Sequence, residues 1–227
     1  MLYHGVYGQS RKISEFVSDR LAADGHSAVV RPLADGAADA ADFDAIVIGA
    51  SIRHGKHNPL VMDFVRAQLG LLESKPSVFF SVSLVARKPH KNTPETNPYV
   101  RAFLAKSPWK PRLVGVFGGV LDYQRYGPFD RHVIRLIMKI NGGPTDLGKS
   151  TEFTNWDEVS RFGARISDLV AGKRVRHSPA IDGEPPARRR GDRAGVAAGR
   201  RPRAGFPVPG ELDPACRRPP APPPPPP

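Results

Sequence analysis

Short apolar runs alternate with amphipathic stretches along the first 170 residues, and this alternation restricts the fold more than any other feature of the chain. The runs are almost continuously apolar, as parallel strands covered on both faces are, and the stretches between them place apolar residues at helical spacing. Strands are predicted over 26–33, 44–52, 77–84 and 112–121. Helices are predicted over 10–24, 58–72, 97–105 and 156–170. This order predicts an α/β fold, a doubly wound parallel five-stranded sheet with helices on both faces and a truncated first strand before position 5.

The composition changes near residue 172. Residues 171–227 hold 15 of the 25 prolines and carry 12 Lys and Arg against 5 Asp and Glu, so they account for +7 of the net charge of +12. They show no hydrophobic period and cannot bury enough apolar surface to offset the entropy of ordering. We therefore predict a folded domain over 1–172, with a helical insertion at 122–143, and a disordered tail over 173–227. We interpret the tail as an incidental extension and expect no nucleic-acid partner.

Several functional classes are disfavoured by what the sequence contains. The single cysteine, Cys216, lies in the tail, which excludes an internal disulfide and any site built from several cysteines. His54 and His57 are three positions apart but have no third ligand nearby, so no metal is expected. The first residues do not resemble a signal peptide, and no apolar run reaches the roughly 20 residues that span a bilayer. We expect a cytoplasmic protein.

Three loops that follow predicted strands form the candidate site, because ligands of doubly wound sheets bind at the carboxyl ends of the strands. The first, HGVYGQS at 4–10, places two glycines before a helix N-terminus, which suits a phosphate. Its spacing is neither GxGxxG nor GxxxxGK[ST], so it fits the terminal phosphate of FMN better than a dinucleotide or a nucleoside triphosphate. In the second loop, at 49–57, small residues allow a flat ring to approach closely. The third, at 83–94, carries a rim of cations that includes Arg87, Lys88 and Lys91.

The insertion contains an amphipathic helix over 128–140. One stripe holds Phe129, Val133, Ile137 and Ile140, with Ile134 and Met138 beside it, and another stripe carries basic residues. This pattern is typical of a helix lying in a lipid headgroup region, and equally of a helix packed on its own domain. Periodicity alone leaves both alternatives open.

These segments resemble a known family when they are taken together. The matching stretches, in order between residues 2 and 170, are GQSRKI, AIVIGASIRHGKHN, FFSVSLVARKPHKNTPETNPY, YGPFDRHVIRLIMKINGGPTD and TEFTNWDEV. They resemble the bacterial quinone-dependent protoporphyrinogen oxidases, which are flavodoxin-like FMN proteins. LVARKP followed by TPxTN, and RxIMKxxGG with its distal T-[DN]-W, are more specific than a generic flavodoxin loop.

The resemblance implies oxidation of protoporphyrinogen IX to protoporphyrin IX in haem biosynthesis, with hydride passing to FMN and electrons to menaquinone or ubiquinone. The cofactor-binding positions that it implies are Gly5, Val6, Tyr7, Gly8, Gln9, Ser10, Ser51, Ile52, Arg53, Ser83, Leu84, Val85, Ala86 and Arg87. Arg53, Arg87 and Lys88 are hypothesised to bind the propionates of the substrate, because guanidinium pairs well with carboxylate. No side chain is identified as a catalytic base. The helix at 128–140 would bring the site to the cytoplasmic face of the inner membrane, and self-association is left open.

Two residues depart from the family pattern. His4 and Tyr7 stand where the family tends to have a hydroxyl residue and a small or acidic one, which weakens the expected phosphate site. Three alternatives therefore stay open: an NAD(P)H:quinone reductase of the same fold, a simple electron-carrying flavodoxin, and a remnant that has lost its flavin. The net charge of +5 over residues 1–170 counts against the carrier, since such proteins are usually acidic.

Overall fold

The computed structural model describes residues 1–36, 40–140 and 142–172. The tail predicted over 173–227 lies outside these residues. All statements of structure below concern the described part of the chain.

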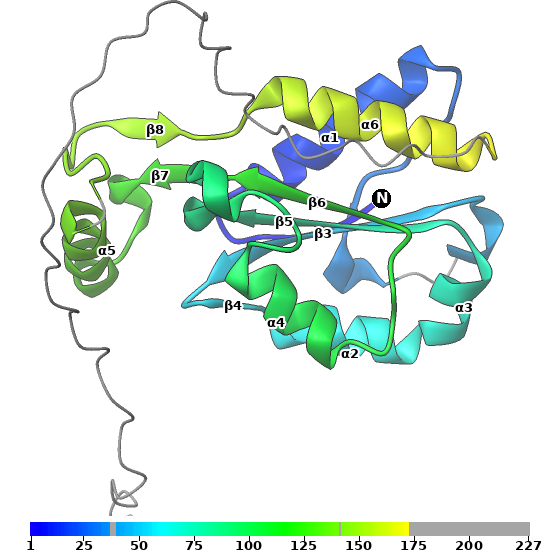
Figure 1. Ribbon diagram of the computed structural model, residues 1–227, viewed down its shortest axis with the longest axis horizontal. Helices are drawn as coiled ribbons and strands as arrows, with labels where there is room; N and C mark the ends of the chain where they lie inside the picture. Colours follow the sequence, from blue (N-terminus) through cyan, green and yellow to red (C-terminus); the bar gives the residue numbers. More distant parts are fainter. Residues whose placement is uncertain (37–39, 141, 173–227) are drawn as a thin grey trace, which may run out of the picture. The chain divides into compact units, whose positions relative to one another are not determined.

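Five parallel strands form the central sheet, in the order β2-β1-β3-β5-β6 (Figure 1). The strands are β1 (Leu2–His4), β2 (Arg31–Pro32), β3 (Ile46–Arg53), β5 (Ser77–Ser83) and β6 (Leu113–Gly118). The strand order is that of flavodoxin-like folds and confirms the predicted sheet. β1 is only three residues long, yet it lies inside the sheet and pairs with both β2 and β3. A two-residue strand, β4 (Lys56–His57), folds back antiparallel on the end of β3.

Helices cover both faces of the sheet, as the alternating pattern predicts. α1 (Gln9–Ala23) and α6 (Trp156–Val170) pack side by side on one face. The opposite face is covered by α2 (Pro59–Ala67), α3 (Leu69–Ser74) and α4 (Pro98–Lys106) (Figure 1). Short 3₁₀ turns connect these elements at Leu33–Asp35, Ala40–Asp42, Leu84–Arg87 and Pro89–Lys91.

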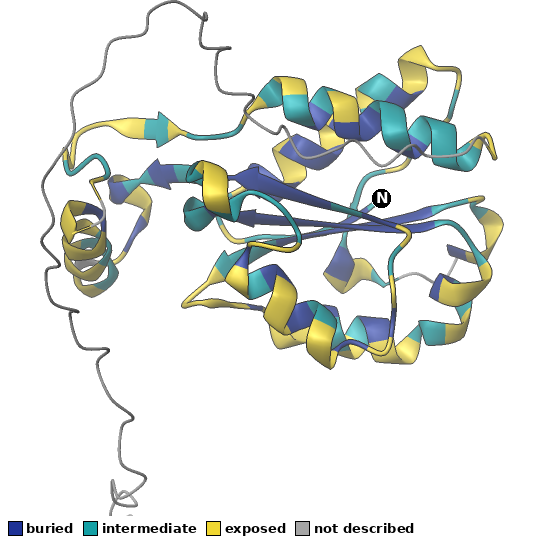
Figure 2. Ribbon diagram, viewed as in Figure 1, coloured by how far each residue is buried: buried dark blue, intermediate teal, exposed yellow. Residues whose placement is uncertain are grey.

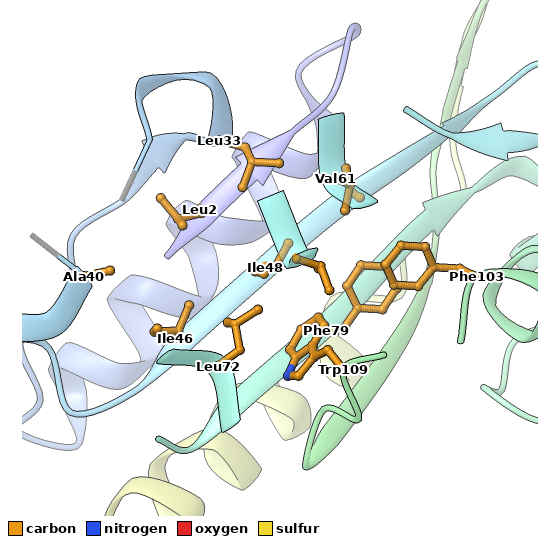
Figure 3. Packing of buried hydrophobic residues seen from close by; sticks show 12 residues of the cluster. Leu2, Leu33, Ala40, Ile46, Ile48, Val61, Leu72, Phe79, Phe103 and Trp109 are labelled. Atoms are coloured by element: carbon orange, nitrogen blue, oxygen red, sulfur yellow. The ribbon is translucent and has the colours of Figure 1, made fainter. Parts of the chain in front are cut away.

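Alternate residues of each strand pack into two separate hydrophobic layers, because successive side chains of a strand point to opposite faces of the sheet. Ile48 and Phe79 face the α2–α4 layer, where they join Phe103 and the fully buried Trp109 (Figure 3). Trp109 Nε1 donates to Ser77 Oγ at 2.8 Å, which satisfies its polar atom inside this layer. Val47 belongs to the other layer, under α1 and α6. The two layers bury both faces of the sheet behind the loops at its carboxyl edge.

The insertion after β6 builds a small layer of its own. β7 (Val120–Asp122) pairs antiparallel with β8 (Ser150–Glu152), and between them lie a 3₁₀ turn (Tyr123–Arg125) and α5 (Pro128–Ile140). Its buried residues are Leu121, Tyr123, Tyr126 and Met138. The helix over 128–140 is thus confirmed, and one of its sides packs on the protein.

Three predicted elements were wrong in extent. Only Arg31 and Pro32 pair in the strand expected over 26–33, and the 3₁₀ turn at Leu33–Asp35 ends it after Pro32. The helix expected over 58–72 is divided at Gln68, whose φ of −111° leaves the helical range.

The strand expected over 112–121 ends at Gly118, and the chain then leaves the sheet to form β7. The carbonyl of Phe153 approaches Gly118 so closely that an added Cβ would lie 2.2 Å from its oxygen. The glycine thus marks a crossing of two backbones, which a run of apolar residues does not reveal.

His57, in β4, is a buried imidazole in apolar surroundings. Its Nε2 lies 2.9 Å from Ser81 Oγ, and its ring contacts Phe79 and Phe103 edge-on. Burial lowers the pKa of His57 to about 4, whereas a histidine in the unfolded chain titrates near about 6.5. The unfolded chain therefore binds this proton more tightly than the folded chain does. The contribution of the neutral His57 to the free energy of unfolding is fully present above about pH 6.5 and is lost as the pH drops towards 4.

We expect the free energy of unfolding to fall by about 2 kcal/mol between about pH 7 and pH 5, as measured by urea denaturation. The His57→Gln variant should lose this part of the pH dependence. The matched variant of the exposed His90, His90→Gln, should keep it. A pH dependence that is the same in His57→Gln and in the unmodified chain would contradict the assignment.

Candidate functional site

A cavity of about 250 Å³ opens at the carboxyl edge of the sheet, between the loops that follow β1, β3 and β5. This is the edge where the strand order changes direction, between β1 and β3. The wall opposite the sheet comes from the insertion. Its residues there are Gly119, Val120, Tyr126, Asp130, Ile134, Ile137 and Met138.

The loop after β1 is shaped for close approach to its neighbours. A Cβ added at Gly5 would lie 2.9 Å from Ser10 Oγ and 3.3 Å from Ser51 Oγ, so these three residues crowd one point. Gly8 has a φ of +85° and starts α1 without a side-chain cap, which leaves the first N–H groups of the helix open to a ligand. Ser10 Oγ is fully buried and has no hydrogen-bond partner among the described residues. A buried hydroxyl without a partner at a helix N-terminus points to an anion that supplies one.

Gln9 is fixed by the segment that leads into α6. Its Nε2 donates to Thr154 Oγ1 at 2.7 Å and to Glu152 Oε1 at 2.9 Å, while Thr154 Oγ1 donates to the carbonyl of Gly118 at 2.8 Å. Asn155 then caps α6 by accepting from the N–H groups of Asp157 and Glu158 at 3.1 and 3.3 Å. The distal T-[DN]-W motif therefore holds the first loop in place from the far side of the insertion.

The loop after β3 is a tight hairpin. His54 and Gly55 separate the paired residues Arg53 and Lys56, and both have positive φ, at 49° and 76°. Positive φ at both central residues is the mark of a type I′ turn, which explains the left-handed backbone of His54. The turn presents Arg53 and His54 to the cavity mouth.

The loop after β5 is braced by Asn97. This fully buried side chain accepts from the N–H groups of Tyr99 and Val100 at 3.1 and 3.2 Å, and its Nδ2 donates to the carbonyl of Lys91 at 2.9 Å. One asparagine therefore starts α4 and ties down the basic loop, which accounts for its place in the TPETN motif. Ser83 Oγ, at the end of β5, is buried and has no hydrogen-bond partner among the described residues.

The insertion contributes aromatic and apolar groups to the cavity. Tyr7 and Tyr126 meet edge to face at 5.0 Å, and Arg125 Nη1 donates to the carbonyl of Tyr7 at 2.8 Å. Burial raises the pKa of Tyr126 to about 12, so its phenol stays protonated near neutral pH. Tyr7, which departs from the family pattern, is therefore part of the contact between the first loop and the insertion.

Most of the predicted site residues come together here. The predicted positions that line the cavity are Gly5, Val6, Tyr7, Gln9, Ser51, Ile52, Arg53, Ser83, Leu84, Val85, Arg87 and Lys88. The other three do not line the cavity: Gly8 is exposed and Ser10 fully buried at the start of α1, and Ala86 is buried beside Val100 and Val116. The lining residues that the sequence did not single out are Val82, Tyr99, Gly119, Val120, Tyr126 and Asp130.

The residues present fit a phosphate joined to a flat ring. The phosphate end has a glycine cradle, an unpartnered buried hydroxyl and an open helix N-terminus. The ring end has the small residue Ser51, the backbone of the 83–87 turn and an apolar wall from α5.

Comparison with known proteins identifies a family and relatives of the chain. Residues 1–148 match the family model of the flavodoxin domain. Protoporphyrinogen IX dehydrogenase (quinone) of Escherichia coli strain K12 is 46% identical over 129 residues, which cover 57% of this chain and 71% of that protein. The protein of the same name from Leishmania major is 41% identical over 181 residues, covering 74% of each. Among solved structures, a flavodoxin from the domain Archaea has 14% identity and a TM-score of 0.42, covering 75% of this chain and 96% of its own.

The family match covers more than half of the chain, and the two relatives are covered over more than two thirds of their length. The sheet order agrees with a flavin-binding fold, as do the loops. The chain belongs to the flavodoxin-domain family of quinone-dependent protoporphyrinogen IX dehydrogenases.

Proposed function

We propose that residues 1–172 oxidise protoporphyrinogen IX to protoporphyrin IX in haem biosynthesis, with FMN as the bound cofactor and a membrane quinone as the electron acceptor. One observation carries the proposal. The relatives at 46% and 41% identity, covered over 71% and 74% of their length, are both named protoporphyrinogen IX dehydrogenase (quinone). The site supports it with a cradle for a flavin phosphate and a cationic rim for a dicarboxylic substrate.

In this proposal Gly5 to Ser10 bind the phosphate of FMN, and the loops at 51–53 and 83–87 flank its ring system. Bound FMN supplies the two-electron acceptor that protein side chains lack. The buried hydroxyls of Ser10 and Ser83 would gain hydrogen-bond partners. Ile134 and Met138 of α5 exclude water from the opposite wall of the cavity.

The basic residues at the rim bind the substrate. Arg53, Arg87 and Lys88 line the cavity from two different loops, so they can hold two carboxylates at separate points. Arg87 is also anchored, because its Nη1 donates to the carbonyl of Leu84 at 3.1 Å and its guanidinium lies 5.9 Å from the centre of the Phe153 ring. The protonated phenol of Tyr126 offers the cavity an O–H donor rather than a base.

A visible spectrum recorded without oxygen tests the proposal. The purified chain, loaded with FMN, should show flavin bands that bleach on addition of protoporphyrinogen IX and recover on addition of a quinone. NADPH should leave the bands unchanged. Bleaching by NADPH but not by protoporphyrinogen IX would replace the proposal with the quinone reductase alternative, and a chain that takes up no FMN would favour the remnant.

We further propose that α5 makes a peripheral contact with the cytoplasmic face of the inner membrane. Much of α5, located by its label in Figure 1, is coloured as exposed in Figure 2. Phe129, Leu136 and Ile140 of this helix are 79%, 59% and 74% exposed. Arg135 and Lys139 are exposed on the same helix and would meet anionic headgroups. Within the described residues no helix has the length and apolar character needed to cross a bilayer. A surface contact would bring the cavity to the quinone without a spanning segment.

The Phe129→Ser/Ile140→Ser variant should bind vesicles of phosphatidylglycerol and phosphatidylcholine at least about tenfold more weakly than the unmodified chain, because two large apolar side chains no longer enter the lipid. Co-sedimentation with the vesicles measures this. The control is Leu60→Ser on α2, which removes an exposed apolar side chain elsewhere and should bind normally. Equal loss in both variants would contradict the contact, and a dimer that dissociates in the double variant would assign the surface to a second copy of the chain.

A further inference from the structure

Asp130 lies in the first turn of α5 and lines the cavity together with Arg53 and His54. Its carboxylate faces both of these residues: Oδ2 is 3.5 Å from Arg53 Nη2, and Oδ1 is 3.6 Å from His54 Nε2. Both partners lie at the β3–β4 turn, and Arg53 precedes Asp130 by 77 positions in the sequence. A carboxylate of the protein is therefore held across the mouth of the cavity by the cation proposed to bind the substrate.

The contact is loose in its geometry. Charge-assisted hydrogen bonds between a guanidinium and a carboxylate are normally about 2.7–2.9 Å long, so both distances exceed the optimum. The side chains of Arg53 and Asp130 are 46% and 27% exposed. Ion pairs with this much exposure to solvent contribute little to stability. A ligand carboxylate that reaches Arg53 with two parallel hydrogen bonds can replace such a partner.

When a ligand displaces Asp130 from Arg53, the carboxylate of Asp130 stays in a favourable electrostatic environment. In the first turn of α5 its negative charge interacts with the positive end of the helix dipole, whether or not Arg53 is its partner. The guanidinium of Arg53, which also lies 5.7 Å from the centre of the Tyr7 ring, stays at the rim of the cavity. The exchange of one carboxylate for another therefore requires no rearrangement of the fold.

We infer that Asp130 is a specificity-determining residue that occupies the place of a substrate carboxylate until the substrate displaces it. This inference rests on the proposed function for the identity of the substrate and adds an internal competitor to its site. The competitor weakens binding of every ligand that uses Arg53 for a carboxylate. It has no such effect on a neutral ligand, because that ligand leaves the Arg53–Asp130 pair intact.

The test measures binding rather than turnover. The FMN-loaded chain is titrated with protoporphyrin IX and, separately, with its dimethyl ester, and fluorescence anisotropy of the porphyrin gives each Kd. Asp130→Asn keeps the shape of the side chain and removes its charge, so it should bind the free acid about threefold to fivefold more tightly. It should bind the ester as the unmodified chain does.

Two further variants isolate the cause. Asp146→Asn changes the net charge equally, at an exposed aspartate that does not line the cavity, and should change the Kd for the free acid less than about twofold. In an Arg53→Ala background, Asp130→Asn should give no gain, because the competition needs both residues. An unchanged or weakened affinity in Asp130→Asn, or an equal gain for the ester, would overturn the inference.

The two proposals fail in different ways. If the unmodified chain binds porphyrin but protoporphyrinogen IX does not bleach its flavin, the proposed function is wrong and the competition at Arg53 is still measured. If turnover is normal while Asp130→Asn and Asp146→Asn have the same Kd, the function stands and the role of Asp130 is wrong. If neither porphyrin binds, the inference about Asp130 fails.

Discussion

Replacing Gly5 by alanine is expected to weaken FMN binding by about 10- to 100-fold while the domain stays folded. The added Cβ would lie 2.9 Å from Ser10 Oγ and 3.1 Å from Ser10 Cβ, so the serine hydroxyl must move away from the proposed phosphate site. Loss of one hydrogen bond to a charged group costs about 1.5–3 kcal/mol, which gives this range. Titration of the apoprotein with FMN, followed by quenching of flavin fluorescence, measures the change.

Gly70→Ala is the matched control. Gly70 lies in α3, and an added Cβ there meets no atom within 4 Å. This variant should bind FMN normally and should be slightly more stable, because alanine favours a helix by about 0.5–1 kcal/mol over glycine. The same Kd for FMN in both variants would show that the cradle at Gly5 does not hold the phosphate.

Replacing Gly118 by alanine is expected to lower the free energy of unfolding by about 1–3 kcal/mol, the usual cost of overpacking. The new Cβ would lie 2.2 Å from the carbonyl oxygen of Phe153 and 2.7 Å from its carbonyl carbon, and a backbone cannot rotate away as a side chain can. For a domain of this size each kcal/mol lowers Tm by about 2–4 °C, which calorimetry resolves.

The Gly118→Ala substitution should also weaken FMN binding. Phe153 is followed by Thr154, which accepts from Gln9 in the first loop, so a shift of this segment loosens the start of α1. The control, Gly148→Ala, introduces a Cβ with an ordinary contact of 3.5 Å to Asp146 and should change neither stability nor FMN binding. A Gly118→Ala variant as stable as the Gly148→Ala variant would show that the two backbones separate at little cost.

The sequence predicted the parts of the fold that depend on local pattern. β3, β5, α5 and α6 have close to the expected bounds, because the two strands are nearly continuous apolar runs and the two helices have a clear hydrophobic period. Asn58, Asn97 and Asn155 cap their helices at the positions where the periodic stretches begin. The order of these elements was enough to predict the parallel sheet.

The rest of the site depends on contacts between distant segments. The apolar stripes of α5 were visible in the sequence, but which side would pack depends on Tyr126 and Tyr7, which lie far apart in the chain. Asp130 could be recognised as a helix residue and not as the partner of Arg53. No local pattern encodes the close approach of Phe153 to Gly118, because it is a meeting of two backbones.

The short inner strand β1 has a consequence for the order in which the protein assembles. β1 is made first, yet its inner neighbour β3 begins more than forty positions later, and Leu2 pairs with Ile48. During synthesis β1 therefore has only the two-residue strand β2 to pair with until β3 has emerged. Contacts of such sequence separation form late because the intervening chain must first be closed into a loop. The cofactor site should accordingly be among the last parts of the domain to become competent for binding.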